Sequence, residues 1–199
     1  LALTAPEKLP NKTDAENDET PFDWPGKVKT GSTSGETLCT TDLFATLADI
    51  LGQRGKLPAT AGEDSFSFLP ALLGKAGNKP LRPFTIHHSI NGSFAIRRGP
   101  WKLALCPGSG GWSGPKPAAA FKNKTLPLVQ LYNLDIDPAE QTNLHNEHPD
   151  LVKDLVGELS KAIRNGRTNP GPKQSNEGWP NTFNGRVLAE YPALTAPKK

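Results

Sequence analysis

The chain has 199 residues with 20 prolines and 19 glycines, only 35% of its residues are hydrophobic, and its formal net charge is +3. A net charge this small gives little support to nucleic-acid binding, which depends on the neutralisation of many phosphates. No apolar run approaches the ~20 residues that a membrane-spanning helix needs. We therefore expect neither nucleic acid nor a membrane as a partner, and one modest domain with long irregular flanks.

The beginning of the chain, LALTAPEKLPNKTDAENDET, shows neither a signal-peptide pattern nor a hydrophobic period. Its polar, proline-containing composition continues to residue 36 and predicts an extended or disordered arm over 1–36. The whole sequence also contains no methionine. A chain without a start residue or an internal methionine is expected to be a piece of a longer product.

The first amphipathic pattern is TTDLFATLADILG, which begins at Thr40. Thr40 or Thr41 can cap a helix at its start and Gly52 can end it. Apolar residues recur at helical spacing at Leu43, Phe44, Leu47, Ile50 and Leu51. The pattern predicts an amphipathic helix, followed by a loop-rich segment with a short helical turn near 67–73.

The segment HHSINGSFAIRRGPWKLAL alternates apolar and polar residues and contains two turn dipeptides. The first dipeptide, Asn-Gly at 91–92, is typical of a two-residue type I′ hairpin turn. Such a turn pairs His88 with Ala95. It pairs His87 with Ile96.

The second dipeptide, Gly99-Pro100, predicts another tight turn, because glycine accepts a positive φ and proline tolerates the following position. Since cross-strand partners share a face, the strands form two surfaces. One surface is apolar and is predicted to face the core, with Phe94, Ile96, Trp101, Leu103, Leu105 and His87. The other is small and polar, with Ala95, Arg97, Lys102, Ala104 and His88.

Two later patterns complete the predicted fold. LVQLYNL at 128–134 reads as a fourth strand after a loop at 107–124, and Pro149 opens a second amphipathic helix that Gly166 ends. We therefore predict an α+β fold: a four-stranded antiparallel sheet packed against a C-terminal helix, with a preceding amphipathic helix and long irregular flanks. The α+β subdomain spans 37–166, and 167–199 is predicted to be an extended tail.

Several stretches, in this order, resemble the C-terminal part of the sulfatase family, in particular the arylsulfatases of the alkaline-phosphatase-like superfamily. They lie between about Phe22 and Gly171 and include FDWPGKVKTGSTS, TTDLFATLADILG, EDSFSFLPALLG, HHSINGSFAIRRGPWKLALCPGSGGWS and LYNLDIDPAEQTNL. The resemblance implies a small domain with a four-stranded antiparallel sheet and a C-terminal helix, which follows a large α/β catalytic domain. It also implies a periplasmic, secreted or lysosomal-type location.

In that family the nucleophile is a formylglycine, made from the cysteine of a Cys-x-Pro-Ser-Arg motif, and carboxylates hold a calcium ion. Neither feature is found in this chain, because Cys106-Pro-Gly-Ser-Gly has its proline one place early and lacks the arginine, and Cys39-Thr-Thr-Asp does not match. The two cysteines are expected to be free thiols, with a disulfide as the alternative. Sulfate-ester hydrolysis needs a nucleophile. The chain alone is therefore predicted to be inactive, with calcium and formylglycine expected in the catalytic domain outside it.

The resemblance makes the HHS stretch the candidate substrate contact, since the loops of the small domain overhang the active-site mouth in similar sulfatases. His88 is the first candidate because the predicted pairing places it on the polar face, and His87 is the second. A histidine there can donate a hydrogen bond or protonate the leaving group. The ordinary alternatives are a packed histidine on the core face and a surface histidine on the other.

Three basic residues in this segment have two possible roles, namely Arg97, Arg98 and Lys102. They form either a sulfate-binding patch or a set of charges at a sheet edge that discourages aggregation. Trp112 can stack on a sugar ring or pack against a neighbouring domain. Asp135 and Asp137 allow a calcium site, but two carboxylates before a proline favour turn formation.

The leading functional interpretation is the C-terminal subdomain of a sulfuric ester hydrolase, which shapes the side where substrate enters the active site. Its expected partners are the N-terminal catalytic domain of the parent sulfatase and a sulfated ester or glycan. The alternative is a non-catalytic binding or interaction module for sulfated glycans.

Overall fold

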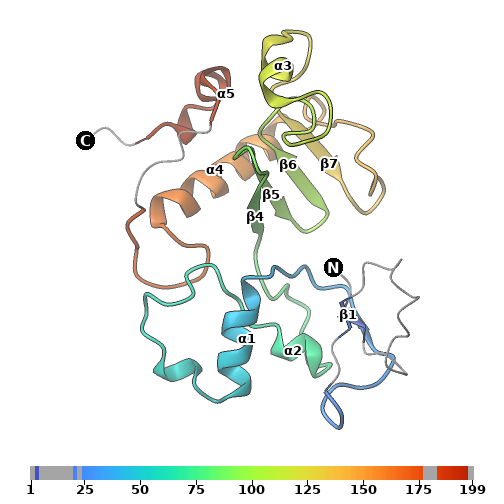
Figure 1. The fold of residues 1–199 in the computed structure, drawn as a ribbon, viewed down its shortest axis with the longest axis vertical. Helices are drawn as coiled ribbons and strands as arrows, with labels where there is room; N and C mark the ends of the chain where they lie inside the picture. Colours follow the sequence, from blue (N-terminus) through green and yellow to red (C-terminus); the bar gives the residue numbers. More distant parts are fainter. Residues whose placement is uncertain (1–2, 5–19, 22–23, 177–182, 197–199) are drawn as a thin grey trace. The chain divides into compact units, whose positions relative to one another are not determined.

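The computed structural model describes residues 3–4, 20–21, 24–176 and 183–196. The chain forms two compact units (Figure 1). The first unit comprises 1–83 with 168–172, and the second comprises 84–167 with 173–199. Most of the arm predicted at 1–36 lies outside the described residues, which there form three two-residue strands, β1 (Leu3–Thr4), β2 (Thr20–Pro21) and β3 (Thr33–Ser34).

The helices of the first unit lie where the sequence predicts them. The amphipathic pattern forms α1 (Asp42–Ile50), and the expected helical turn forms α2 (Leu69–Leu72). A short 3-10 helix, η1 (Arg54–Lys56), lies between them. Gly52 follows α1 with a φ of +63°, as expected of a residue that ends a helix.

The apolar side of α1 faces solvent, and this reverses the usual orientation of an amphipathic helix. The buried residues of the helix are Asp42, Ala45, Thr46 and Ala48. Leu47 is 53% exposed and Leu51 is 69% exposed, with Leu43 and Phe44 also exposed. The spacing rule therefore identifies the helix correctly but does not identify which side of it is buried.

The interior of the first unit is held by a buried ion pair. The Nη1 atom of Arg82 lies 2.7 Å from the Oδ2 atom of Asp42, and both side chains are almost fully buried. The same carboxylate accepts hydrogen bonds from the backbone N–H of Cys39 at 2.8 Å and of Phe66 at 2.9 Å. Because a buried charge is tolerated only when it is paired and hydrogen-bonded, these contacts together account for a carboxylate on the inner side of α1.

The second unit contains a four-stranded antiparallel sheet in the order β4-β5-β6-β7 (Figure 1). Its strands are β4 (Thr85–His88), β5 (Phe94–Arg98), β6 (Trp101–Ala104) and β7 (Gln130–Asn133). The long helix α4 (Pro149–Asn165) packs on one face of the sheet. The predicted α+β fold, with its sheet and covering helix, is confirmed.

The core lies between this sheet and α4. Ile96 and Leu103 pair across the central strands, and both are completely buried. They belong to the same cluster as Leu155 and Leu159 of α4, which are also completely buried. Gly166 ends the helix in the left-handed conformation with a φ of +62°, as its position in the sequence predicts.

The turn between β4 and β5 differs from the predicted one, and this changes which histidine lies on which face. The N–H of Gly92 bonds to the carbonyl of Ser89 at 2.9 Å, and the N–H of Ser89 bonds to the carbonyl of Ser93 at 3.0 Å. Gly92 has a φ of +74°, whereas Asn91 has no positive φ. The connection is therefore a three-residue loop that closes with glycine in the left-handed region, not a two-residue type I′ turn.

This additional loop residue shifts the pairing of β4 by one position. His87 pairs with Ala95, and His88 pairs with Phe94. Since a shift of one residue exchanges the two faces of a strand, the predicted faces of the histidines were wrong. His87 lies on the polar face, and His88 lies on the face that carries the core residues.

The second hairpin is confirmed. Gly99 has a φ of +55°, and Arg98 pairs with Trp101 across the two-residue turn. Beyond the last pair of the ladder, the N–H of Leu105 donates to the carbonyl of Phe94 at 2.8 Å.

Two segments predicted to be irregular contain helices. The loop at 107–124 includes α3 (Pro117–Lys122). The described part of 167–199, predicted as an extended tail, includes α5 (Gly185–Glu190) and the 3-10 helix η2 (Pro192–Leu194). Apolar side chains hold these three helices in place. Ala120 of α3, Val187 of α5 and Leu194 of η2 are completely buried. The domain boundaries at 36 and 166 stay predictions.

Candidate functional site

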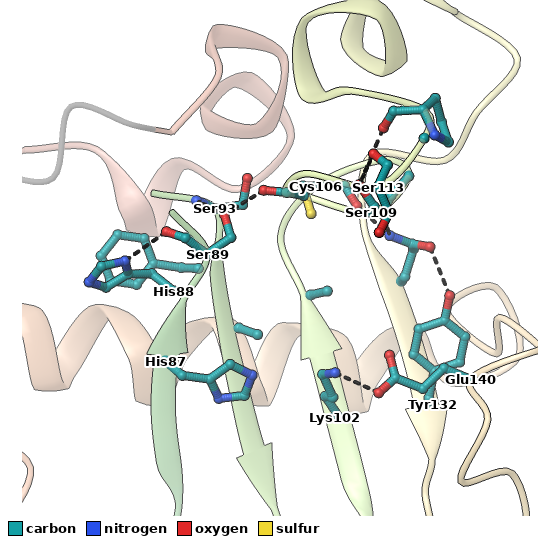
Figure 2. A pocket seen from close by; sticks show the side chains of 18 of the residues that line it. His87, His88, Ser89, Ser93, Lys102, Cys106, Ser109, Ser113, Tyr132 and Glu140 are labelled. Atoms are coloured by element: carbon teal, nitrogen blue, oxygen red, sulfur yellow. Dashed lines mark hydrogen bonds and ion pairs between the residues drawn. The ribbon is translucent and has the colours of Figure 1, made fainter. Parts of the chain in front are cut away.

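A pocket of about 780 Å³ lies on the face of the sheet opposite α4 (Figure 2). Its floor is formed by two adjacent cross-strand rows. One row runs from His87 through Ala95 and Ala104 to Gln130, and the other includes Lys102 and Tyr132. Because the two central side chains of the first row are methyl groups, the floor is hollow between its polar ends. We call this cavity the open-face pocket.

A lysine and a carboxylate meet at one side of the open-face pocket. The Nζ atom of Lys102 donates to Oε1 of Glu140 at 2.5 Å (Figure 2). Glu140 has a φ of +56°, a conformation that non-glycine residues seldom adopt. The turn that presents it is fixed by the Asp137 carboxylate, which accepts the N–H groups of Gln141 at 3.0 Å and Thr142 at 2.8 Å. The carboxylate of Glu140 is thus placed beside Lys102 by the local backbone.

A glutamine organises the far wall of the pocket. The Nε2 atom of Gln130 donates to the carbonyl oxygens of Cys106 at 2.7 Å and Gly108 at 2.8 Å. Its Oε1 accepts the hydroxyl proton of Tyr132 at 2.7 Å (Figure 2). The amide therefore connects β7 to the loop after β6 and directs the Tyr132 hydroxyl group.

The glycine-rich loop 107–116 is bound to the first hairpin. The Ser89 hydroxyl donates to the carbonyl of Gly110, and the side-chain amide of Asn91 donates to the carbonyl of Gly111 at 3.4 Å. Gly110 has a φ of +67°, and a Cβ atom there would lie 2.7 Å from the sulfur of Cys106. Only glycine fits this position without displacement, so the approach of the loop to the sheet depends on it.

The environment of the open-face pocket favours the neutral form of three titratable side chains. Partial burial, with the Lys102 ammonium next in importance, lowers the pKa of His87. Burial raises the pKa of Cys106. Burial and then the carboxylate of Glu140 raise the pKa of Tyr132. Near pH 7 the imidazole is therefore mainly unprotonated, the thiol is not a thiolate, and the phenol is not ionised.

Both histidines of the candidate substrate contact line the pocket, but in different settings. His87 lies on the floor beside Lys102 (Figure 2). His88 lies at the rim, where its ring centroid is 5.7 Å from that of Phe94 and its Nδ1 atom is 2.9 Å from the carbonyl oxygen of Ser89. The structure thus gives His87, the second candidate, the position that was predicted for His88.

The three cations of the predicted patch are not brought together. Arg98 lies on the α4 side, where its Nη1 atom is 3.1 Å from Oε1 of Glu158. Arg97 lies on the open face and donates from Nε to the carbonyl of Gly99 at 3.0 Å. The alternative interpretation as edge charges was also wrong, because β5 and β6 are the inner strands. Lys102 is the one of the three that lines the pocket.

The remaining candidates have local structural roles. Asp137 stabilises its own turn, which also lowers its pKa, as expected from turn chemistry. Cys39 and Cys106 are free thiols, as predicted. Trp112 is 76% exposed at the loop between two pocket-lining segments. Among the described residues, no group of three or more His, Cys, Asp or Glu side chains could hold a metal ion, so these residues do not fit the family's calcium.

Three pocket residues were missed by the sequence analysis, namely Gln130, Tyr132 and Glu140. Gln130 and Tyr132 alternate with the core residue Leu131, so the period of the predicted fourth strand was sufficient to place them on the polar face. Glu140 has no comparable pattern, because its position depends on a left-handed backbone in an irregular turn.

Comparisons with known proteins agree with this architecture. No protein-family model matches the chain. It is 33% identical over 147 residues to N-acetylgalactosamine-6-O-sulfatase of Bacteroides thetaiotaomicron, covering 71% of this chain and 26% of that protein. It is 26% identical over 134 residues to arylsulfatase K of Rattus norvegicus, covering 61% of this chain and 20% of that protein.

Solved structures give the same result. One structure comes from work on the metabolism of multiple glycosaminoglycans by B. thetaiotaomicron. It matches with a TM-score of 0.54 and 30% identity, and the match covers 70% of this chain and 27% of that one. A structure of Ps i-CgsB shares the fold, with a TM-score of 0.53 at 19% identity. The match covers 84% of this chain and 34% of that one.

The fold and these relationships define a sulfatase-related domain. What the chain matches is a sulfatase C-terminal region, and it spans between a fifth and about a quarter of the length of the curated relatives. Within the described part of the chain, none of the helices is long and apolar enough to cross a membrane.

Proposed function

We propose that this chain is the C-terminal subdomain of a sulfatase, and that it shapes the side where substrate enters the active site. The single observation that carries the proposal is the open-face pocket, which lies in a domain related to sulfatases, is lined by all four strands and receives polar side chains from β4, β6 and β7. A cavity of about 780 Å³ is within the ~300–1,000 Å³ range of small-molecule sites.

The nucleophile and the calcium ligands are supplied by the N-terminal catalytic domain of the parent enzyme. Cys106 is unsuited to the nucleophilic role, because it is buried and its pKa is raised. The calcium ligands are assigned to the same catalytic domain because of the resemblance to sulfatases. Formylglycine and calcium therefore belong to the catalytic domain in this proposal.

The apolar side of α1 is the contact surface for that catalytic domain. Leu43, Phe44, Leu47 and Leu51 form an exposed stripe on one short helix, and exposed apolar patches of this kind mark interaction surfaces. The partner is the remaining three quarters of a sulfatase-sized protein, since this chain covers only 26% of its bacterial relative.

The substrate class is a sulfated glycan. The bacterial relative is an N-acetylgalactosamine-6-O-sulfatase. A sulfated N-acetylhexosamine is therefore the first substrate to test. His87 and His88 are the proposed substrate contacts in this chain. His87 is the stronger of the two, because it is on the pocket floor and is unprotonated near pH 7, so that it can both donate and accept a hydrogen bond.

The test compares this chain with the protein encoded by the longer reading frame that contains it. Sulfate release from a sulfated N-acetylhexosamine should be absent for the chain alone and present for the longer protein. Turnover by the chain alone would overturn the proposal. So would a longer protein that binds sulfated glycans without hydrolysing them, since this result would support a non-catalytic binding module.

A further inference from the structure

The charges in the open-face pocket indicate which part of a substrate it can hold. Lys102 and Glu140 are the only formally charged side chains among the described residues that line it, apart from the two histidines. They neutralise one another at 2.5 Å. With His87 unprotonated near pH 7, the lining has little net charge.

A sulfate group is poorly suited to this pocket. A sulfate oxygen within hydrogen-bond distance of Lys102 would also lie close to the Glu140 carboxylate, because the two charged groups are in contact. The repulsion from that carboxylate would offset the attraction to the lysine, since both act over similar distances. The turn of Asp137 holds the backbone of Glu140 beside Lys102, and the ion pair at 2.5 Å keeps the carboxylate there.

The polar groups that remain match hydroxyl groups instead. The Tyr132 hydroxyl uses its proton on Gln130, so its oxygen is left to a ligand only as an acceptor. Glu140 is a second acceptor, Lys102 has two further N–H donors beyond its bond to Glu140, and a neutral His87 has one donor and one acceptor nitrogen. Sugar hydroxyl groups both donate and accept, so they can satisfy this mixed set.

We propose that the open-face pocket binds the uncharged ring of the substrate sugar through its hydroxyl groups, and that the sulfate ester lies outside it. This inference rests on the proposed function and assigns the sulfate to the catalytic domain. It makes Tyr132, Lys102 and Glu140 residues that determine specificity for the carbohydrate.

The test adds each probe stepwise to the full 199-residue chain and monitors the backbone amide signals by NMR, at low and at high salt. The probes are N-acetylgalactosamine, its 6-sulfate and inorganic sulfate. We expect N-acetylgalactosamine to perturb the pocket amides with an affinity that changes less than about twofold with salt, because no charge is neutralised. Its 6-sulfate should bind with similar affinity, and inorganic sulfate should leave these amides unchanged.

Two conservative variants make the test specific. Tyr132→Phe removes one acceptor and should weaken sugar binding about five- to tenfold, while Lys122→Met, on the exposed end of α3, should not. Glu140→Gln should weaken sugar binding and create a new, salt-sensitive response to inorganic sulfate, because the charge of Lys102 is then no longer neutralised.

Either of two results would overturn the inference. One is perturbation of the pocket amides of the wild-type chain by inorganic sulfate, with an affinity that falls steeply with salt. The other is a lack of response to N-acetylgalactosamine well above millimolar concentration. Neither result bears on whether the longer protein hydrolyses sulfate esters, so the failure of this inference is distinguishable from failure of the proposed function. If the isolated chain aggregates, inhibition of the longer protein by N-acetylgalactosamine, and its weakening in Tyr132→Phe, tests sugar binding instead.

Discussion

The two units of this chain are stabilised in opposite ways. In the second unit, α4 buries a stripe of apolar residues against the sheet, and polar groups are left to the open face. In the first unit, α1 buries a carboxylate and small residues, and leaves its large apolar side chains exposed. The comparison teaches that the second unit has an extensive apolar core, whereas the first combines a buried ion pair with a small apolar cluster at Phe68 and Leu72 and exposes an apolar helix surface that suits a partner.

The largest expected effect is the loss of the buried ion pair in the first unit. Asp42→Ala leaves the buried guanidinium of Arg82 without its carboxylate and should cost about 3–5 kcal/mol. Hydrogen exchange of amides within 24–83 measures the loss. The matched control is Asp49→Ala, which removes a partly exposed partner of Arg54 at 3.6 Å and should cost less than about 1 kcal/mol. Equal effects of the two variants would mean that the buried ion pair does not stabilise the first unit.

A somewhat smaller effect is expected in the core of the second unit. Leu155→Ala removes a completely buried side chain from α4 and should cost about 2–5 kcal/mol. The same truncation at Leu51, which is 69% exposed on the apolar side of α1, should change the stability of the isolated chain by less than about 0.5 kcal/mol. Urea unfolding of the two variants measures the difference. A large destabilisation by Leu51→Ala would show that α1 is packed within this chain.

A local effect is expected at the glycine-rich loop. Gly110→Ala places a methyl group 2.7 Å from the Cys106 sulfur in a left-handed backbone, and should destabilise the loop by about 1–3 kcal/mol. Its neighbour is the control, because a Cβ atom at Gly111 would lie 3.8 Å from the nearest atom. Faster hydrogen exchange in 107–116 for the first variant only is the expected result. Indistinguishable exchange in the two variants would contradict the close approach of loop and sheet.

The smallest effect is a pH dependence that arises from His87. Its pKa in the folded chain is below its ordinary value of 6.5, so the unfolded chain binds more protons in this range. The contribution of His87 to the free energy of unfolding is therefore fully present above about pH 6.5. It decreases as the pH falls from there to the lower pKa of the folded chain. Burial contributes most to the lowered pKa, the charges of Lys102, Arg97 and His88 add to it, and the carboxylate of Glu140 opposes it. A ring titration by NMR checks the direction, and a His87 pKa above 6.5 would contradict it.

The fold of the second unit could largely be predicted from the sequence, because its period-two strands and the stripe of α4 follow local rules. The register of β4 could not. Both a two-residue and a three-residue loop fit Asn91-Gly92, and the hydrogen bond from Ser89 to Gly110 that favours the longer loop joins residues 21 positions apart. One residue of loop length was enough to exchange His87 and His88.

The candidate site was predictable only in part for the same reason. Lys102 and the two histidines were recognised as polar groups near turns, and the alternation of β7 places Tyr132 beside them. The ion pair of Lys102 with Glu140 spans 38 positions and depends on a turn of unusual backbone conformation. The orientation of α1 was also hidden, because Arg82 lies 40 positions from Asp42.

The central claim is that the open face of the sheet holds the substrate sugar and that His87 contacts it. The most direct measurement is kcat/KM of the longer protein on a sulfated N-acetylhexosamine, with His87→Ala compared to Ile90→Ala at the exposed tip of the same hairpin. We predict about a tenfold loss for His87→Ala through a raised KM, corresponding to ~1.4 kcal/mol, and less than about a twofold change for Ile90→Ala. Unchanged kinetics of His87→Ala in a folded, active protein would contradict the claim.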